Sequence, residues 1–134
     1  MPTPAKSHYT FNLRDLSKVV QGILMVSLQD LEEKNQLVML WIHETFRVFR
    51  DRLIDQADRD KYSKLAHDRL ENYLDMEWNL EDFEKVLFGD FESAERHYLK
   101  LSDTNTLIPR LEEYLTLYNA DNSQMNLVFF EDCI

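Results

Sequence analysis

Arg14 is the residue of this sequence best placed for chemistry, because it lies in the first turn of an expected helix. Asn12 is a favoured N-cap residue, and Asp15 stands three residues later, where a capping box places its acid. Phe11 and Leu16 occupy the two positions of a hydrophobic staple. The unpaired N–H groups and the dipole of such a terminus favour negative charge, and a guanidinium adds a planar pair of donors. This arrangement predicts contact with a phosphate.

A purely structural arginine is the alternative for Arg14. A cation belongs at the other end of a helix dipole, so helix stability does not account for an arginine at this position. In the alternative, its side chain extends to solvent or pairs with Asp15 or Asp30. From spacing alone, this structural interpretation is the commoner case.

Other catalytic patterns are missing from the sequence. His43-Glu44 resembles the first half of a zinc-protease motif, but Arg47 occupies the position of the second histidine. Phosphate-binding loops of the types GxxxxGK[ST] and GxGxxG are absent, as is the GxSxG elbow. We therefore predict no catalytic residue and no metal site. The remaining histidines lie on separate segments without ligand-like pairing: His8, His67 and His97.

Composition limits the class of protein. The 134 residues suit one domain, and only two glycines and three prolines are available for turns, which predicts an all-α fold. The net charge of −10 without a basic stripe argues against nucleic-acid and anionic-membrane partners. Cys133 is the single cysteine, and neither a signal peptide nor a membrane-length apolar run is present, so we expect a reducing, cytosolic compartment.

Apolar spacing predicts the helices that position Arg14. After an extended tether over residues 1–7, the first helix runs from Leu13 to about Val26, and a central helix buried on two sides ends near Leu53. Gly22 is either a close-packing point or a local weakness of the first helix. The expected core face of the first helix is Leu13, Leu16, Val20, Ile23 and Leu24, and the rival caps of the central helix are Ser27, Asp30 and Asn35.

The second half of the chain is less regular. Asp58 is the expected cap of a third helix, and a short helical piece covers residues 80–87. Residues 76–103 form an irregular excursion. A final helix spans about 107–118, with Pro109 in its first turn, where proline is tolerated. A new apolar pattern then begins at residue 125, which we interpret as a boundary inside a larger polypeptide.

Four blocks of the sequence resemble axonemal dynein heavy chains at the third AAA+ module of the motor ring: HYTFNLRDLSKVVQGIL, LWIHETFRVFRDRLID, FGDF and YNADNSQMNLVFFED. The resemblance covers nearly the whole chain. It implies the small helical lid subdomain, a bundle of four to five helices. It also implies a linker from the large subdomain at 1–11, the lid at 12–121 and the link into the fourth module at 122–134.

The resemblance implies a role for Arg14. AAA+ lids carry a sensor-two arginine that reaches the nucleotide phosphates, and Arg14 matches its position, with Leu13 and Asn12 near the base or sugar. The P-loop, Mg²⁺-holding acids and arginine finger belong to large subdomains, so this chain alone is expected to have no cofactor and to hydrolyse no ATP. The intact module would bind ATP or ADP with Mg²⁺.

The resemblance also implies a setting. The parent would be an ATP-hydrolysing microtubule motor of the ciliary axoneme, in which the third module regulates the ring. The partners of the lid would be the large subdomain of its own module and the adjacent modules. One alternative stays open, a free-standing acidic helical module that binds partner helices. P-loops encoded upstream and downstream of this segment would favour the lid.

Overall fold

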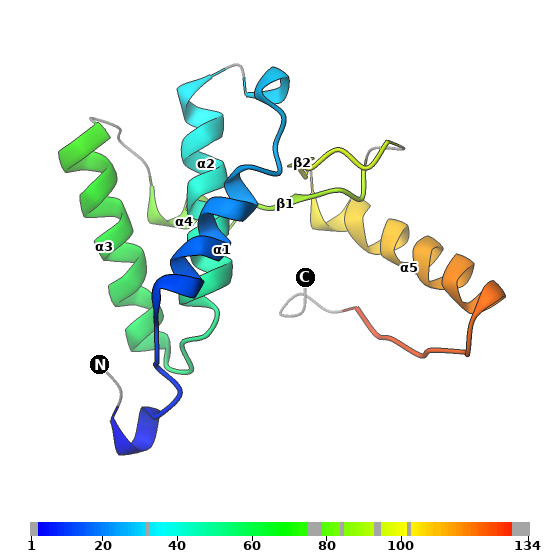
Figure 1. Cartoon of the computed structure of the whole chain (residues 1–134), viewed down its shortest axis with the longest axis horizontal. Helices are drawn as coiled ribbons and strands as arrows, with labels where there is room; N and C mark the ends of the chain where they lie inside the picture. The colour runs from blue at the N-terminus through cyan, green and yellow to red at the C-terminus, as the bar shows by residue number, and fades with distance from the viewer. Residues whose placement is uncertain are drawn as a thin grey trace. The chain divides into compact units, whose positions relative to one another are not determined.

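The computed structural model describes residues 3–31, 33–74, 79–83, 85–92, 95–101 and 103–129. The chain forms two compact units, Met1–Leu87 and Phe88–Ile134 (Figure 1). The described residues contain five α-helices and one pair of short strands, so the predicted helical fold is confirmed. None of the described helices is long and apolar enough to cross a membrane. The predicted boundaries at residues 11 and 121 remain predictions.

Helix α1 of the first unit (Leu13–Ile23) begins as the sequence predicts. Asn12 Oδ1 accepts hydrogen bonds from the backbone N–H groups of Arg14 (2.8 Å) and Asp15 (3.3 Å). Asp15 Oδ2 in turn accepts from the backbone N–H of Asn12 (3.0 Å), which completes the capping box. The helix ends at Ile23, before the predicted end at Val26, because the chain turns at Leu24.

The predicted core face of α1 is wrong. The residues that α1 buries are Asp15, Val19 and Gly22, and this side packs on α2 and η3. Ile23 is half-buried. The other members of the predicted face are half or more exposed: Leu13 83%, Leu16 52%, Val20 50% and Leu24 75%.

Helix α2 (Lys34–Thr45) continues into the π-helix η3 (Phe46–Arg50). None of the three predicted N-cap residues, Ser27, Asp30 and Asn35, is the N-cap of α2. Ser27 caps a short 3-10 turn, η2 (Leu28–Asp30), and α2 begins after Glu33, whose backbone N–H donates to Gln36 Oε1 (3.2 Å). The residues that α2 and η3 bury lie on two sides, which confirms the two-sided packing: Val38, Leu40, Ile42, Glu44, Thr45, Phe46 and Val48.

The core of the first unit forms where α2 and η3 meet α3 (Gln56–Leu74) and the short α4 (Leu80–Phe83). Helix α3 starts at Gln56, two residues before its predicted cap Asp58. Trp41 is half-buried and packs against the cluster. The ring of Phe46 lies 5.9 Å from that of Phe83. The core cluster consists of Val38, Ile42, Phe46, Ala66, Leu70 and Phe83.

The N-terminal segment is attached to this unit and is not a free tether. It contains a 3-10 turn, η1 (Pro4–Lys6), and the Lys6 ammonium is ion-paired with Asp55 and Asp58 at the start of α3. Tyr9 is buried, and its hydroxyl oxygen accepts a hydrogen bond from the backbone N–H of Ile54 (2.9 Å).

The second unit contains a two-stranded antiparallel sheet and α5 (Thr104–Asp121). Strand β1 (Phe88–Gly89) pairs with β2 (Leu99–Lys100) inside the predicted excursion. Helix α5 begins at Thr104 after its cap Asp103, so Pro109 is its sixth residue and lies beyond the predicted first turn. Residues 122–129 contain neither helix nor strand, and 130–134 of the predicted link lie outside the described residues.

Candidate functional site

Arg14 is the second residue of α1, at its capped N-terminus. Its side chain is exposed and forms no ion pair or hydrogen bond with any residue that the structure describes. Asp15 and Asp30 were its alternative partners, and Arg14 contacts neither of them. The guanidinium is therefore exposed and without a partner among the described residues, which leaves it open to contact with another group.

Leu13 and Asn12 differ in what they offer to a ligand. Leu13 is 83% exposed, so its side chain can contact a neighbouring group. Asn12 is also exposed, but its side-chain oxygen already accepts two backbone hydrogen bonds in the cap. Among the three predicted site residues, Arg14 and Leu13 are open to a ligand, whereas Asn12 acts by fixing the helix terminus.

An apolar strip runs along the outward side of α1. It consists of Leu13, Leu16, Val20 and Leu24, each at least half exposed. Single exposed apolar side chains are common, but four on one face of one helix indicate a surface that another structure covers. Arg14 lies in the same turn as the first member of this strip.

The inward side of α1 is held by Asp15, which is buried. Arg52 Nη1 lies 3.0 Å from Asp15 Oδ1, and Lys18 Nζ lies 3.9 Å from the same oxygen. The backbone hydrogen bond from Asn12, followed by the charge of Arg52, lowers the pKa of Asp15. Because these contacts tie the first turn of α1 to the end of η3, they fix the position of the helix terminus that carries Arg14.

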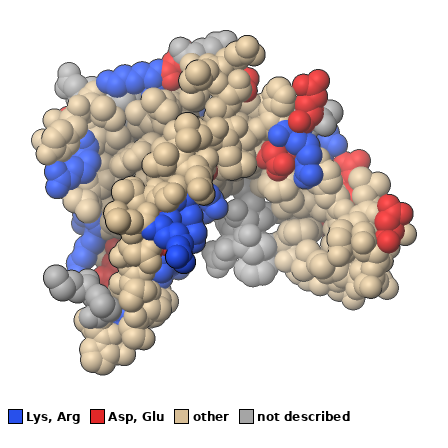
Figure 2. All heavy atoms as spheres, viewed as in Figure 1, with Lys and Arg blue, Asp and Glu red and all other residues tan. Residues whose placement is uncertain are grey.

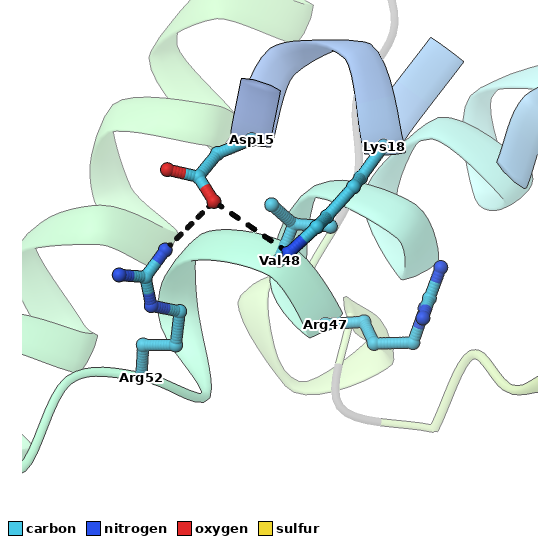
Figure 3. A pocket seen from close by; sticks show the side chains of 5 residues that line it. All are labelled: Asp15, Lys18, Arg47, Val48 and Arg52. Carbon is cyan, nitrogen blue, oxygen red and sulfur yellow. Dashed lines mark ion pairs between the residues drawn. The ribbon is translucent and has the colours of Figure 1, made fainter. Parts of the chain in front are cut away.

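Basic side chains gather where α1 crosses α2 and η3 (Figure 2). A cavity of about 250 Å³ lies there, lined by Asp15, Lys18, Arg47, Val48 and Arg52. In Figure 3, Lys18 and Arg52 reach Asp15 from opposite directions. No pattern in the sequence predicted this pocket, because its cations come from α1, from η3 and from the turn after η3 and share no periodic spacing.

Gly22 is a close-packing point between α1 and α2. A Cβ atom at residue 22 would lie 2.0 Å from Glu44 Oε2, so the Glu44 carboxylate fills the space that a side chain would need. Glu44 is fully buried, and Arg47 Nη2 lies 2.6 Å from Glu44 Oε2. Burial lowers the pKa of the neighbouring His43. Glu44 thus belongs to the interface between α1 and α2, whereas the His43 ring lies 3.4 Å from the carbonyl oxygen of Val86.

One group of possible metal ligands also escaped the sequence analysis. His67, Asp68 and Glu71 on α3 bring their ligand atoms within 4.8 Å of one another. His67 Nδ1 lies 3.7 Å from Glu71 Oε2. The two acids are exposed, so we assign no metal to this cluster.

Comparison with known proteins gives one family and several relatives. The family model of the AAA+ lid domain matches residues 1–84. Over the whole chain, the sequence is 45% identical to dynein axonemal heavy chain 1 of Rattus norvegicus, across 139 aligned residues. It is 39% identical to dynein axonemal heavy chain 2 and 40% identical to dynein axonemal heavy chain 6, both of Homo sapiens. The chain spans about 3% of the length of these relatives.

Proposed function

The chain belongs to the AAA+ lid domain family, and from this premise we propose that it is the lid of a nucleotide-binding module in an axonemal dynein heavy chain. We assign it to the third AAA+ module of the ring, where the nucleotide state would regulate how the ring transmits conformational change. The motor would hydrolyse ATP, move along microtubules and work in the ciliary axoneme. The similarity to axonemal heavy chains along the full length of the chain supports this setting.

The exposed guanidinium of Arg14 is the observation that carries the proposal. It lies at the capped, positive end of α1, and no acid among the described residues forms an ion pair with it. A planar guanidinium can donate to two phosphate oxygens at once. When hydrolysis removes the terminal phosphate, that contact is lost, so the angle of the lid follows the nucleotide state.

The apolar strip of α1 supports a partner that covers this side of the helix. The lid would be joined there to the large subdomain of its own module, with the nucleotide between them. Leu13 would then lie beside the base or sugar. The capping box and the Asp15–Arg52 contact would hold Arg14 in place while the lid moves.

The chain alone offers only part of such a site, since the phosphate-binding loop would lie on the large subdomain. We therefore expect it to hydrolyse no ATP and to bind ATP and ADP with dissociation constants of about 1 mM or weaker. Isothermal titration calorimetry measures this directly. A micromolar affinity of the isolated chain would contradict the proposal.

Arg14→Ala in the intact motor tests the role of the arginine. Loss of a charge-assisted hydrogen bond costs about 1.5–3 kcal/mol, so the nucleotide affinity of this module should fall about 10- to 100-fold. Arg69→Ala removes an exposed arginine from α3 and serves as the matched control. An unchanged affinity in Arg14→Ala, or an equal loss in Arg69→Ala, would show that Arg14 does not contact the nucleotide.

A further inference from the structure

The basic pocket of the first unit has no part in the proposed contact with Arg14. Three cations and one acid line it, Lys18, Arg47 and Arg52 against Asp15, in a chain whose net charge is −10. Figure 2 shows few acidic side chains among the described residues on this face of the unit. The local excess of positive charge therefore runs against the charge of the whole chain.

Asp15, the acid in the pocket, does not pair with all the hydrogen-bond donors of the cations around it. Asp15 Oδ2 accepts the backbone hydrogen bond of Asn12, so Lys18 and Arg52 share Oδ1 (Figure 3). The 3.9 Å between Lys18 Nζ and that oxygen is too long for a hydrogen bond. Lys18 makes no hydrogen bond to another described side chain, so its ammonium donors can reach an added acceptor.

Arg52 is held in position before any ligand arrives. Its Nη2 donates to the backbone carbonyl oxygen of Thr10 (3.3 Å), and its guanidinium lies 4.8 Å from the centre of the Phe11 ring. Its Nε–H is without a partner among the residues that the structure describes. Because the side chain is already ordered, less conformational entropy is lost when a ligand binds.

The volume of the pocket limits how large a ligand it can enclose. Its volume of about 250 Å³ lies below the roughly 300–1,000 Å³ of pockets that enclose drug-sized molecules, so it would hold one phosphate group and leave the rest of a larger ligand in solvent. A single tetrahedral oxyanion is smaller and matches the donor geometry of Arg and Lys. We propose that the pocket lined by Lys18, Arg47 and Arg52 binds a phosphate group, either as the free ion or as the end of a larger molecule that extends into solvent.

The charges around the pocket set the expected strength. The negative charge of Asp15 compensates one of the three cations. The negative charge of Glu44 compensates Arg47, because Glu44 Oε2 lies 2.6 Å from Arg47 Nη2. The remaining charge is small and solvent reaches it, so we expect a dissociation constant on the order of 1 mM for inorganic phosphate.

The test is an amide NMR titration of the 134-residue chain with sodium phosphate, compared with sodium chloride at equal ionic strength. We expect saturable shifts confined to α1 and η3. Lys18→Gln should weaken binding about fivefold, as expected for loss of an exposed ion pair. Lys64→Gln removes the same charge from an exposed position on α3 and should leave the affinity unchanged. Arg14→Ala should also leave it unchanged, which separates this site from the proposed nucleotide contact.

A phosphate monoester, glycerol 3-phosphate, distinguishes the two sources. Saturable shifts of the same amides with the monoester would support the site and identify a larger phosphorylated ligand. Saturation with inorganic phosphate alone would support the site and identify the free ion. Shifts that grow linearly, that chloride reproduces, or that weaken equally in Lys18→Gln and Lys64→Gln would overturn the proposal.

Discussion

Gly22→Ala is the substitution whose effect the structure predicts most directly. The added Cβ would lie 2.0 Å from Glu44 Oε2 and 2.1 Å from Glu44 Cδ, whereas favourable contacts between heavy atoms occur at about 3.5–4.0 Å. Glu44 is fully buried, and moving its carboxylate away from the new Cβ also disturbs its contact with Arg47. We therefore expect the substitution to destabilise the first unit.

Three contributions determine the change in the free energy of unfolding; two are destabilising and one is stabilising. Overpacking a filled interface costs about 1–3 kcal/mol. Displacement of the Glu44 carboxylate also weakens its contact with Arg47; complete disruption of a fully buried ion pair costs about 3–5 kcal/mol, which is an upper limit here because the Arg47 side chain is 54% exposed. Replacing glycine by alanine within a helix stabilises the helix by about 1 kcal/mol. If the ion pair is only partly lost, Gly22→Ala should lower the free energy of unfolding by about 2–4 kcal/mol.

Urea unfolding followed by tryptophan fluorescence measures this change in the first unit alone, because Trp41 and Trp78 both lie within residues 1–87. Glu44→Ala provides the matched background, since the atoms that clash with the new Cβ are then absent. In that background, Gly22→Ala should be neutral or stabilising by up to about 1 kcal/mol. An equal cost in both backgrounds, or no cost in either, would refute this account of the interface.

Three further predictions concern the rest of the first unit. Leu70→Ala should lower the free energy of unfolding by about 2–5 kcal/mol, because Leu70 is only 2% exposed. Leu65→Ala on the same helix should change it by no more than about 0.5 kcal/mol, because Leu65 is 52% exposed. Equal losses in the two variants would mean that the core is misassigned. Burial lowers the pKa of His43 below its usual 6.5, so stability should fall as the pH drops below 6.5, and His43→Gln should flatten that slope in pH-dependent unfolding. Lys6→Ala should speed amide hydrogen exchange in residues 3–10, since it breaks both ion pairs that attach this segment to α3; unchanged exchange would contradict the attachment.

Local signals in the sequence predicted the start of α1 correctly. The cap of Asn12 and Asp15 involves residues three apart, so its hydrogen bonds do not depend on the rest of the fold. The two-sided burial of α2 was also predictable, because a helix with two apolar stripes must pack on both. The cap at Glu33 was missed, since glutamate is not among the favoured N-cap residues.

Contacts between distant segments could not be predicted. The apolar pattern of α1 identifies an amphipathic helix, but which side this chain covers depends on partners, and the chain covers the side of Val19 and Gly22. The ion pair between Asp15 and Arg52 joins α1 to the turn after η3, so no spacing rule reveals it. Pro109 was expected in the first turn of its helix, but α5 begins earlier and contains it.

A cryo-EM structure of the intact axonemal motor with nucleotide bound would show whether Arg14 contacts the nucleotide phosphates. The quantity to measure is the distance from the Arg14 guanidinium to the nearest phosphate oxygen in the module that contains this lid. We predict about 2.7–2.9 Å, the length of a charge-assisted hydrogen bond. An Arg14 side chain that points to solvent or pairs with a protein carboxylate while nucleotide occupies the module would contradict the claim.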